Sequence, residues 1–443
     1  MNARARGRPQ AAPQVSIIED LSHEGRGVTH HAGKVVFVED ALPGERVEWQ
    51  QTKRGPNFDE ARLIRIVEAS PDRVEANCGH FGSCGGCALQ HLAPGKQLEF
   101  KQGQLMGALT RIGKVTPERV LEPLQAKVWQ YRRRARLGAR WVPKKNRVVV
   151  GFKERSTSYI ADLQRCEILR EPLTGLVPEL SLLLTSLSIP NRIPQIEVSV
   201  ADEVVALVIR VLEPLTDADM QALHDFEQRH QVEIYLQPGG YDTVAPISAN
   251  ARPLTYRLPQ FDVTLEFLPT DFIQVNGELN ERMIERVVEL LQPTAEESVL
   301  DLFCGLGNFS LPLARVAKNV VGVEGEAGLV QRAAKNAERN GIANAEFFTA
   351  NLAAPDLASA GWARRKYDKV LLDPPRAGAL EVLPVVAATQ ASRVVYVSCH
   401  PGTLARDAGV LVHEHGFKLT AAGVMDMFPH TAHVESVAVF DRD

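Results

Sequence analysis

Two side chains near the end of the chain have the chemistry of a nucleophile and a proton acceptor. The thiol of Cys399 stands in the polar turn Ser-Cys-His-Pro, directly after an apolar run. The carboxylate of Glu435 stands just before the last apolar run. A lone cysteine is more often a small buried apolar residue, and a lone carboxylate is often simply solvated. The position of Cys399 beyond a strand end, where active-site groups of open α/β sheets gather, favours a chemical role.

Activation of that thiol requires a nearby cation or a helix terminus. A thiol with an ordinary pKa of about 8.5 is only a few per cent ionised at neutral pH, and a neighbouring positive charge lowers that pKa. Arg376 and His400 are the candidates for this help. Cys304 lies inside a glycine-rich turn, and we assign it to packing.

A second group of residues predicts a nucleotide site. An apolar strand runs into a turn that contains Gly305 and Gly307, and such glycines let the backbone pass close to a ligand at a helix N-terminus. A dinucleotide fingerprint requires a third glycine where this chain has Ser310, which disfavours NAD. The next two strands end near Glu324, placed for ribose hydroxyls, and Asn351, placed for an adenine edge. The combination predicts S-adenosylmethionine (SAM), with another doubly wound nucleotide binder as the alternative.

The fourth strand of this half runs into the loop Asp373-Pro-Pro-Arg376. It resembles the Asn/Asp-Pro-Pro-Tyr loop of amino-group methyltransferases, in which an aromatic residue stacks on the target base. Arg376 occupies the aromatic position here, which argues against methylation of an amino group. A nucleophilic cysteine beside a SAM site suggests instead methylation of a pyrimidine at C5. In that reaction Cys399 would attack C6, and Glu435 would remove the C5 proton.

Several motifs together closely resemble the RNA uracil-C5 methyltransferase family over essentially the whole chain. They are DFIQVN (271–276), DLFCGLGNFS (301–310), LLDPPRAG (371–378), SCHPGTLARD (398–407) and HVES (433–436). The resemblance implies that Cys399 is the nucleophile, that Glu435 is the proton acceptor, and that six residues line the SAM site: Gln274, Phe303, Asn308, Glu324, Asn351 and Asp373. Two departures are Pro375, where the family usually has Ala, and His400, where it often has Asn. Neither removes a reacting group, but His400 could change how the thiolate is activated.

Three more cysteines crowd into ten residues as Cys78-x5-Cys84-x2-Cys87. Zinc sites usually pair two short cysteine hooks, and only one is present. Three close cysteines with a distant fourth are nearer to iron–sulfur spacing, so a [4Fe-4S] cluster is favoured over zinc. Cys166 is the remaining candidate for the fourth ligand, because Cys304 and Cys399 belong to the SAM half. We expect the cluster to be structural or to position RNA.

The family resemblance adds a substrate to this prediction. Within the family, a four-cysteine [4Fe-4S] site together with a TRAM domain, an RNA-binding barrel, marks the subgroup that methylates uracil 1939 of 23S rRNA. A sister enzyme for another 23S rRNA or tRNA uridine is the nearest alternative. A non-catalytic iron–sulfur RNA-binding protein would need neither Cys399 nor Glu435. A DNA cytosine methyltransferase would use a Pro-Cys nucleophile, whereas Ser398 precedes the cysteine here.

The elements that must position these residues divide the 443-residue chain into three parts. Short alternating strands at 12–70 predict a TRAM-like or OB-like β-barrel. A strand-rich central domain with the iron–sulfur cluster is predicted at 71–93 and 125–262. Alternating helices and apolar strands at 94–124 and 263–443 predict an α/β, Rossmann-like SAM-methyltransferase domain, with one helix over about 95–112.

Charge distribution points to a polyanionic partner. Residues 1–160 carry 27 Lys+Arg against 16 Asp+Glu, and the remainder carries 23 against 38. The stretch 129–141 interleaves arginines with Trp129, Tyr131 and Trp141, and an alternating strand would put Arg132, Arg134 and Arg136 on one face. An ordinary charged sheet face is the alternative. Phe272 is a candidate to stack on a base.

The predicted partner is therefore 23S rRNA, with no membrane and no obligate protein partner. The N-terminal tail is basic and has no apolar signal region, and no apolar run is long enough to span a bilayer. These features predict a cytoplasmic protein.

Overall fold

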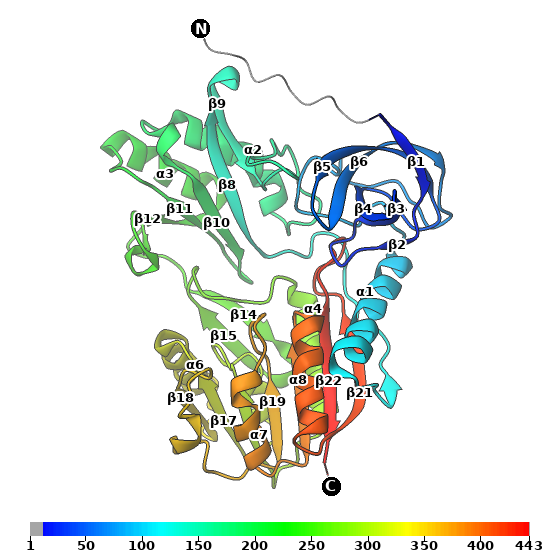
Figure 1. Cartoon of the computed structure of the whole chain (residues 1–443). Helices are drawn as coiled ribbons and strands as arrows, with labels where there is room; N and C mark the ends of the chain where they lie inside the picture. Colours follow the sequence, from blue (N-terminus) through cyan, green and yellow to red (C-terminus); the bar gives the residue numbers. More distant parts are fainter. Residues whose placement is uncertain (1–11, 443) are drawn as a thin grey trace. The chain divides into compact units, whose positions relative to one another are not determined.

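The computed structural model describes residues 12–442. The chain divides into two compact units (Figure 1). Among the described residues, the first consists of 12–101 together with His430–His433, and the second of Gln102–Pro429 together with 434–442. In the part of the chain that the structure describes, no helix is both long and apolar enough to cross a membrane.

The first unit contains one six-stranded sheet in the order β1-β5-β6-β4-β3-β2. Its pairs are antiparallel except for β4 with β6. Alternation along the strands buries one set of side chains, among them Val36, Val38, Val47 and Trp49. The strands are β1 (Gln14–Ile17), β2 (Asp20–Leu21), β3 (Gly27–His31), β4 (Lys34–Glu39), β5 (Arg46–Arg54) and β6 (Phe58–Glu68).

One helix follows the cysteine-rich loop. The predicted helix over about 95–112 is present as α1 (Pro94–Ala108), which continues into one π-helical turn at Leu109–Gly113. Gly113 lies against α8 (Pro401–His413) so closely that a Cβ atom there would stand 2.3 Å from the carbonyl oxygen of Ala405. Only a residue without a side chain fits here between the turn and α8.

The second unit begins with a six-stranded sheet in the order β13-β12-β11-β10-β8-β9. Two helices, α2 (Leu173–Ser186) and α3 (Asp217–His230), pack against β9 and β12. A separate hairpin, β14 (Leu254–Leu258) with β15 (Val263–Phe267), follows. The strands of the sheet are β8 (Arg134–Val142), β9 (Arg147–Gly151), β10 (Gln195–Val200), β11 (Val205–Arg210), β12 (Val232–Gln237) and β13 (Ala245–Pro246).

The largest sheet of the second unit has eight strands in the order β18-β17-β16-β19-β20-β22-β21-β7. The five strands from β18 to β20 are parallel, and β22 inserts antiparallel between β20 and β21. Its strands are β16 (Ser298–Leu302), β17 (Asn319–Glu324), β18 (Ala345–Thr349), β19 (Lys369–Leu372), β20 (Arg393–Ser398), β21 (Lys418–Met425), β22 (Glu435–Asp441) and β7 (Arg119–Val120).

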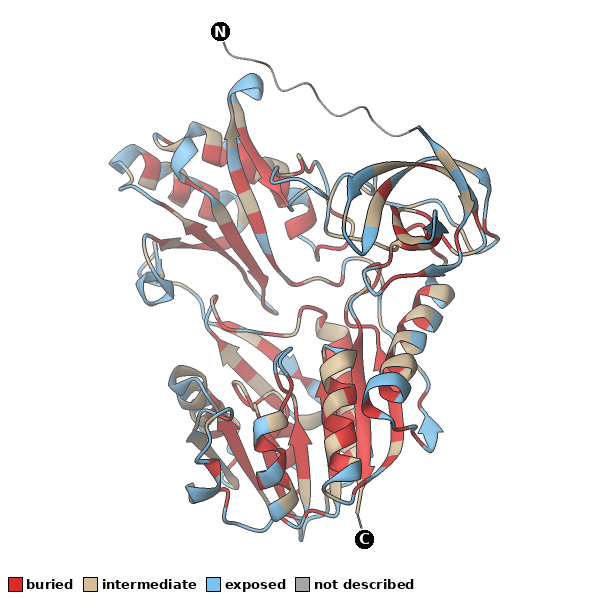
Figure 2. Cartoon of the chain, in the orientation of Figure 1, coloured by how far each residue is buried: buried red, intermediate tan, exposed pale blue. Residues whose placement is uncertain are grey.

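Helices cover this sheet, and its central strands are buried over most of their length (Figure 2). Their near-continuous apolar runs fit parallel strands covered on both faces. The helix α4 contacts β19, β20 and β22, and α8 contacts β20, β21 and β22. The helices are α4 (Gly277–Leu291), α5 (Ser310–Ala314), α6 (Ala327–Arg339), α7 (Leu383–Ala388) and α8.

The strand order creates a switch point between β16 and β19. From β16 the chain moves outward to β17 and β18, then returns to add β19 and β20 on the other side. Connections on the two sides run in opposite directions, which leaves a crevice beyond the carboxyl ends of these strands. That crevice is where the predicted nucleotide residues should gather.

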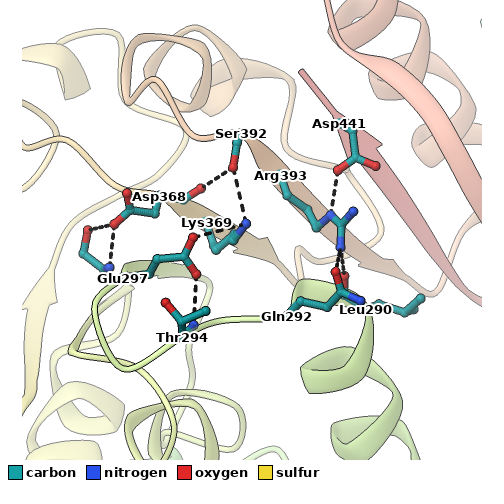
Figure 3. Close-up of polar contacts among 10 residues, drawn as sticks. Leu290, Gln292, Thr294, Glu297, Asp368, Lys369, Ser392, Arg393 and Asp441 are labelled. Carbon is teal, nitrogen blue, oxygen red and sulfur yellow. Dashed lines mark hydrogen bonds and ion pairs between the residues drawn. The ribbon is translucent and has the colours of Figure 1, made fainter. Parts of the chain in front are cut away.

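The opposite end of the sheet is held by polar contacts that involve no predicted site residue (Figure 3). Arg393 donates from Nε to Oδ1 of Asp441 at 2.6 Å and from Nη1 to the carbonyl of Leu290 at 3.0 Å. Asp368 accepts from the backbone and the hydroxyl of Ser298 at 2.7 and 2.9 Å. The start of β20 is thus tied to the end of β22, far along these strands from the crevice.

Candidate active site

The ladder between β20 and β22 brings Cys399 and Glu435 together. Ser398 and Ser436 are register partners in this antiparallel pair, and the Ser436 hydroxyl donates to the Ser398 carbonyl at 3.1 Å. The ladder ends at this pair; Cys399 directly follows β20, and Glu435 is the first residue of β22. Glu435 raises the pKa of the Cys399 thiol, so the two side chains lie close enough to interact. The predicted nucleophile and proton acceptor are therefore neighbours, although 35 residues separate them in the sequence.

Four titratable groups share this end of the sheet. Burial, followed by the negative charges of Glu435 and Asp373, raises the pKa of the Cys399 thiol to about 11, while Arg376 lowers it. Burial and Asp373 also raise the pKa of Glu435 well above its usual range, and Arg376 again acts in the opposite direction. Cys399 keeps partial access to solvent, whereas Glu435 is buried. A thiol, two carboxyl groups and one guanidinium thus form a single coupled cluster.

Asp373 connects this cluster to the switch point. It follows β19 directly, and its N–H donates to the carbonyl of Leu302, the last residue of β16, at 3.3 Å. Burial raises the pKa of Asp373 to about 7. The carboxyl group therefore stands where the two central strands end, beside the crevice.

The glycine-rich turn lies on the other side of that crevice. Phe303, Gly305 and Gly307 all have positive φ angles, of 68°, 56° and 94°. A Cβ atom at Gly305 would meet no atom within 4 Å among the described residues, so this side of the turn is open. The Gly305 N–H donates to Oε2 of Glu324 at 3.2 Å. The predicted ribose-binding carboxylate is thereby held at the end of β17, directly beside the turn.

A buried carboxyl group beneath the turn was not assigned a role by the sequence. Asp301, in β16, is fully buried, and its Oδ2 accepts from the Ser310 hydroxyl at 2.5 Å. Its Oδ1 has no hydrogen-bond partner within residues 12–442. Burial raises the pKa of Asp301 to about 7, with Asp373 and Glu324 adding to the rise. An orphaned buried oxygen and an open glycine turn fit a polar, positively charged ligand.

Asn308 is engaged by protein groups. Its Oδ1 accepts from the Tyr256 hydroxyl at 2.9 Å and from Nδ2 of Asn280 at 3.1 Å, and its Nδ2 donates to Oδ1 of Asn280 at 2.9 Å. Of the remaining SAM candidates, Asn351 is exposed two residues past β18, and its Oδ1 accepts from Ala353 N–H at 3.1 Å. Sequence reasoning missed Asn280 and Tyr256, because neither belongs to a motif.

The 271–276 segment is anchored by a buried arginine. Arg133 donates from Nε to the carbonyl of Gln274 at 2.8 Å, and its guanidinium carbon lies 4.5 Å from the centre of the Tyr256 ring. Phe272 in the same segment is 68% exposed. The signal for Arg133 was present in the sequence, since alternation along a strand turns it away from Arg132 and Arg134.

Much of the predicted arginine stripe is used inside the protein. Arg134 donates to the carbonyl of Thr270 at 3.0 Å and lies 3.5 Å from Glu197, and Arg136 lies 2.9 Å from the same carboxylate. The expected alternation is present, because Ala135 and Leu137, which alternate with these arginines along β8, are buried. Arg134 is therefore chiefly a structural residue, and Arg136 is the more exposed of the two.

The cysteine-rich loop provides thiols but no assembled metal site. Cys78, Cys84 and Cys87 are partly exposed, Cys166 is buried, and Gly86 N–H donates to Sγ of Cys84 at 3.4 Å. Within the described residues, no three His, Cys, Asp or Glu side chains are arranged to hold a metal ion. The donor chemistry and the N–H···S contact fit a thiolate-bound metal, but the convergence of ligands stays a prediction.

Comparison with known proteins agrees with this geometry. A family model described as tRNA (uracil-5-)-methyltransferase matches residues 96–443, and a TRAM domain model matches residues 17–64. The chain is 53% identical to the 23S rRNA (uracil(1939)-C(5))-methyltransferase RlmD of Stenotrophomonas maltophilia (strain R551-3), over 99% of this chain and 100% of the relative. It is 52% identical, with the same coverage, to the RlmD of Xanthomonas axonopodis pv. citri.

A solved structure shows the same likeness. The crystal structure of Pyrococcus abyssi tRNA (uracil-54, C5)-methyltransferase in complex with S-adenosyl-L-homocysteine superposes with a TM-score of 0.75. The two chains are 25% identical, and the match covers 96% of this chain and 99% of the other.

Proposed function

The chain belongs to the tRNA (uracil-5-)-methyltransferase family, and from that premise we propose that it methylates C5 of a uracil in 23S rRNA with SAM as the methyl donor. The closeness of Cys399, just after β20, to Glu435, at the start of the neighbouring strand β22, carries this proposal. Relatives that share half of all residues over the full length act on uracil 1939 of 23S rRNA, whereas the tRNA enzyme of known structure shares a quarter. The rRNA substrate, at that position, is therefore favoured over a tRNA.

The residues support a three-step mechanism. The Cys399 thiol first loses its proton to solvent, and Glu435 reacts as its carboxylate. The thiolate Sγ atom then adds to C6, and the C5=C6 electron pair shifts to form an enolate with the C4 carbonyl group. C5 then takes the methyl group as the bond from that carbon to the SAM sulfur breaks, which leaves S-adenosylhomocysteine. Glu435 removes the C5 proton, the C5=C6 bond re-forms and the Sγ–C6 bond breaks.

The electrostatics of the cluster suit these roles. Burial keeps Glu435 protonated more readily than an exposed glutamate, so its carboxylate is a stronger base once it has lost that proton. The raised pKa of Cys399 means that the thiol holds its proton in the free enzyme at neutral pH. Ionisation of the Cys399 thiol therefore requires positive charge nearby. Arg376 supplies one such charge, and the sulfonium of SAM carries a second.

The SAM site we propose is built from both sides of the crevice. Glu324, at the end of β17, would bind ribose hydroxyls, and Asn351 would contact the adenine. The backbone of the turn at Phe303 and Asn308 would lie along the donor. Gln274 and Asp373 complete the predicted set.

The target base must leave its stack before the thiolate can reach C6. Extrusion costs a few kcal/mol unless the base already lies in a loop. The exposed ring of Phe272, two residues before Gln274, is placed to stack on an extruded or neighbouring base.

We propose further that Cys78, Cys84, Cys87 and Cys166 hold a [4Fe-4S] cluster, with zinc as the alternative. Four thiolates leave no iron open, so the cluster would stabilise the loop or position RNA, and no step of methyl transfer passes through it. Anaerobically purified protein should contain about four iron atoms per chain, should absorb broadly in the visible, and should lose that band in Cys78→Ser. Stoichiometric zinc without iron would refute the assignment. The three-part domain division and the cytoplasmic location also stay predictions.

Methylation with labelled SAM tests the function directly. Fragments of 23S rRNA and bulk tRNA are supplied in parallel, and the modified nucleotide is mapped. Label in a 23S fragment at C5 of one uracil is expected, and label confined to tRNA would overturn the substrate assignment.

A further inference from the structure

Asp407, the last residue of the SCHPGTLARD motif, is fully buried in α8 and joins three parts of the site. Its Oδ2 accepts from the Tyr396 hydroxyl at 2.7 Å and from the Ala379 N–H at 2.7 Å. Its Oδ1 accepts from Nε of Arg406 at 2.7 Å. Tyr396 lies in β20 three residues before Cys399, and Ala379 ends the loop that begins at Asp373.

Two further contacts from α8 hold the same loop. The Thr403 hydroxyl donates to the carbonyl of Arg376 at 3.1 Å, and Nη2 of Arg406 donates to the carbonyl of Ala377 at 2.9 Å. With the bond from Ala379 to Asp407, three of four consecutive residues from 376 to 379 are tied to the helix that follows the nucleophile. We call this set of contacts the loop clamp.

Gly378 shows how closely the loop clamp is packed. It has a φ of 86°, and a Cβ atom there would stand 2.6 Å from both Nη2 of Arg406 and Oδ2 of Asp407. A larger residue at Gly378 would displace the carboxylate and strain the backbone. The loop can therefore lie in this position only because residue 378 has no side chain.

We propose that Asp407 is a positioning residue that clamps the 373–379 loop to α8 and thereby fixes where the backbone of Arg376 lies relative to Cys399. This inference rests on the proposed role of Cys399 as the nucleophile. Asp407 itself touches neither reacting atom, and its effect is carried by the loop.

The charges around Cys399 explain why the position of Arg376 matters. Glu435, from β22, and Asp373, from the loop, both raise the pKa of the thiol, and His400 follows Cys399 directly. Arg376 is the charged side chain that lowers the pKa of the thiol, and a backbone hydrogen bond at Cys399 adds a smaller effect in the same direction. If the loop moves Arg376 away, the thiol still feels both carboxyl groups but loses the nearby cation, and its pKa rises further.

The test is the rate of alkylation of Cys399 by iodoacetamide as a function of pH, followed peptide by peptide with mass spectrometry in the full chain. The thiolate is the reacting species, so the rate reports its fraction. Asp407→Asn is expected to shift the profile upward by about one pH unit, which slows alkylation about tenfold below the midpoint. Arg376→Gln should produce a shift in the same direction.

Two comparisons separate positioning from a general loss of structure. Asp441→Asn removes another Arg-paired aspartate, at the end of the eight-stranded sheet far from Cys399, and should leave the profile unchanged. Thr403→Val removes one contact of the loop clamp without touching the buried carboxylate, and should shift the profile in the same direction by less. Thr403→Ser keeps the hydroxyl and should restore the wild-type profile.

Unshifted profiles in both Asp407→Asn and Thr403→Val would overturn the positioning role, whatever their thermal stability. That result would leave the proposed function intact as long as the wild-type chain still forms a covalent adduct with RNA through Cys399. Absence of that adduct in the wild-type chain would instead refute the proposed function itself.

Discussion

Replacement of Glu435 by glutamine separates the two halves of the proposed reaction. Glutamine has the shape of a neutral glutamic acid but cannot accept the C5 proton. Attack by Cys399 and methyl transfer do not need that acceptor, whereas release of the product does. The Glu435→Gln enzyme should therefore stop as a covalent complex between Cys399 and methylated RNA.

The structure sets the expected magnitudes. General base catalysis contributes roughly 10²–10⁴-fold, so turnover should fall by at least about a hundredfold, equivalent to about 2.7 kcal/mol of activation free energy. Adduct formation should not slow to the same degree, because removal of the Glu435 charge lowers the pKa of Cys399. The protein should not be destabilised at neutral pH. A buried carboxyl group with a raised pKa lowers the free energy of unfolding once the pH rises above the pKa that the group has in the unfolded chain. Glutamine does not ionise, so it removes that effect.

The assay is a single turnover with end-labelled 23S rRNA fragment and SAM, resolved on a denaturing gel. Most of the labelled RNA should migrate with the protein in Glu435→Gln, and none should do so in Cys399→Ala. Asp441→Asn, in the same strand β22, is the matched control and should turn over normally without a trapped complex. Normal turnover by Glu435→Gln, or an adduct in Cys399→Ala, would refute the assignment.

Three further outcomes are expected. Asp301→Asn should flatten the pH dependence of the unfolding midpoint of the SAM-free protein. The pKa of this carboxyl group rises from 3.8 to about 7 on folding, so the folded protein loses stability as the pH rises between those values, by at most about 4 kcal/mol at 1.36 kcal/mol per pH unit. An unchanged slope would contradict the assigned burial of Asp301. Asn280→Ala should weaken SAM binding about tenfold, as measured by calorimetry. The substitution removes the hydrogen bonds that hold the Asn308 side chain in place, and we expect a loss of about 1.4 kcal/mol of binding free energy. An unaltered affinity would show that SAM binding does not depend on the Asn280 partner of Asn308. Phe272→Ala should raise KM for RNA about tenfold, from 1–3 kcal/mol of stacking, with SAM affinity unchanged as the internal control; an unaltered KM would exclude base stacking there.

The α/β half was predictable from the sequence because its signals are local. The glycine turn and Glu324 lie at the ends of β16 and β17, as expected, since apolar runs define parallel strands and polar residues mark their ends. The alternating strands of the TRAM region follow from the same kind of local pattern. The closeness of Cys399 to Glu435 was predicted only because the proposed reaction requires a nucleophile and a proton acceptor. Strand register could not predict it, because register depends on a pairing that composition does not reveal.

Non-local partners account for most of what was missed. Arg134 and Arg136 look like an RNA-binding stripe, but their counter-charge, Glu197, comes from another strand some sixty residues later. Asn280 and Tyr256 hold Asn308 from a helix and a hairpin that no motif marks. The cysteine-rich loop contains residues of the right type for metal ligands, but no local pattern determines where their side chains point. Spacing alone could therefore suggest a cluster but could not predict how the thiols would converge on it.

The pairing of Ser398 with Ser436 sets which residue of β22 lies near Cys399, so the length of the β21–β22 connection affects the composition of the site. Neighbouring strand residues point to opposite faces, so an insertion or deletion of one residue that shifted β22 would present Val434 or Ser436 to the thiol instead of Glu435. A chain with residues 426–434 shortened or extended in this way should therefore no longer hold Glu435 near the thiol. Insertions and deletions in this connection should therefore reduce activity far more than those in surface loops elsewhere in the molecule.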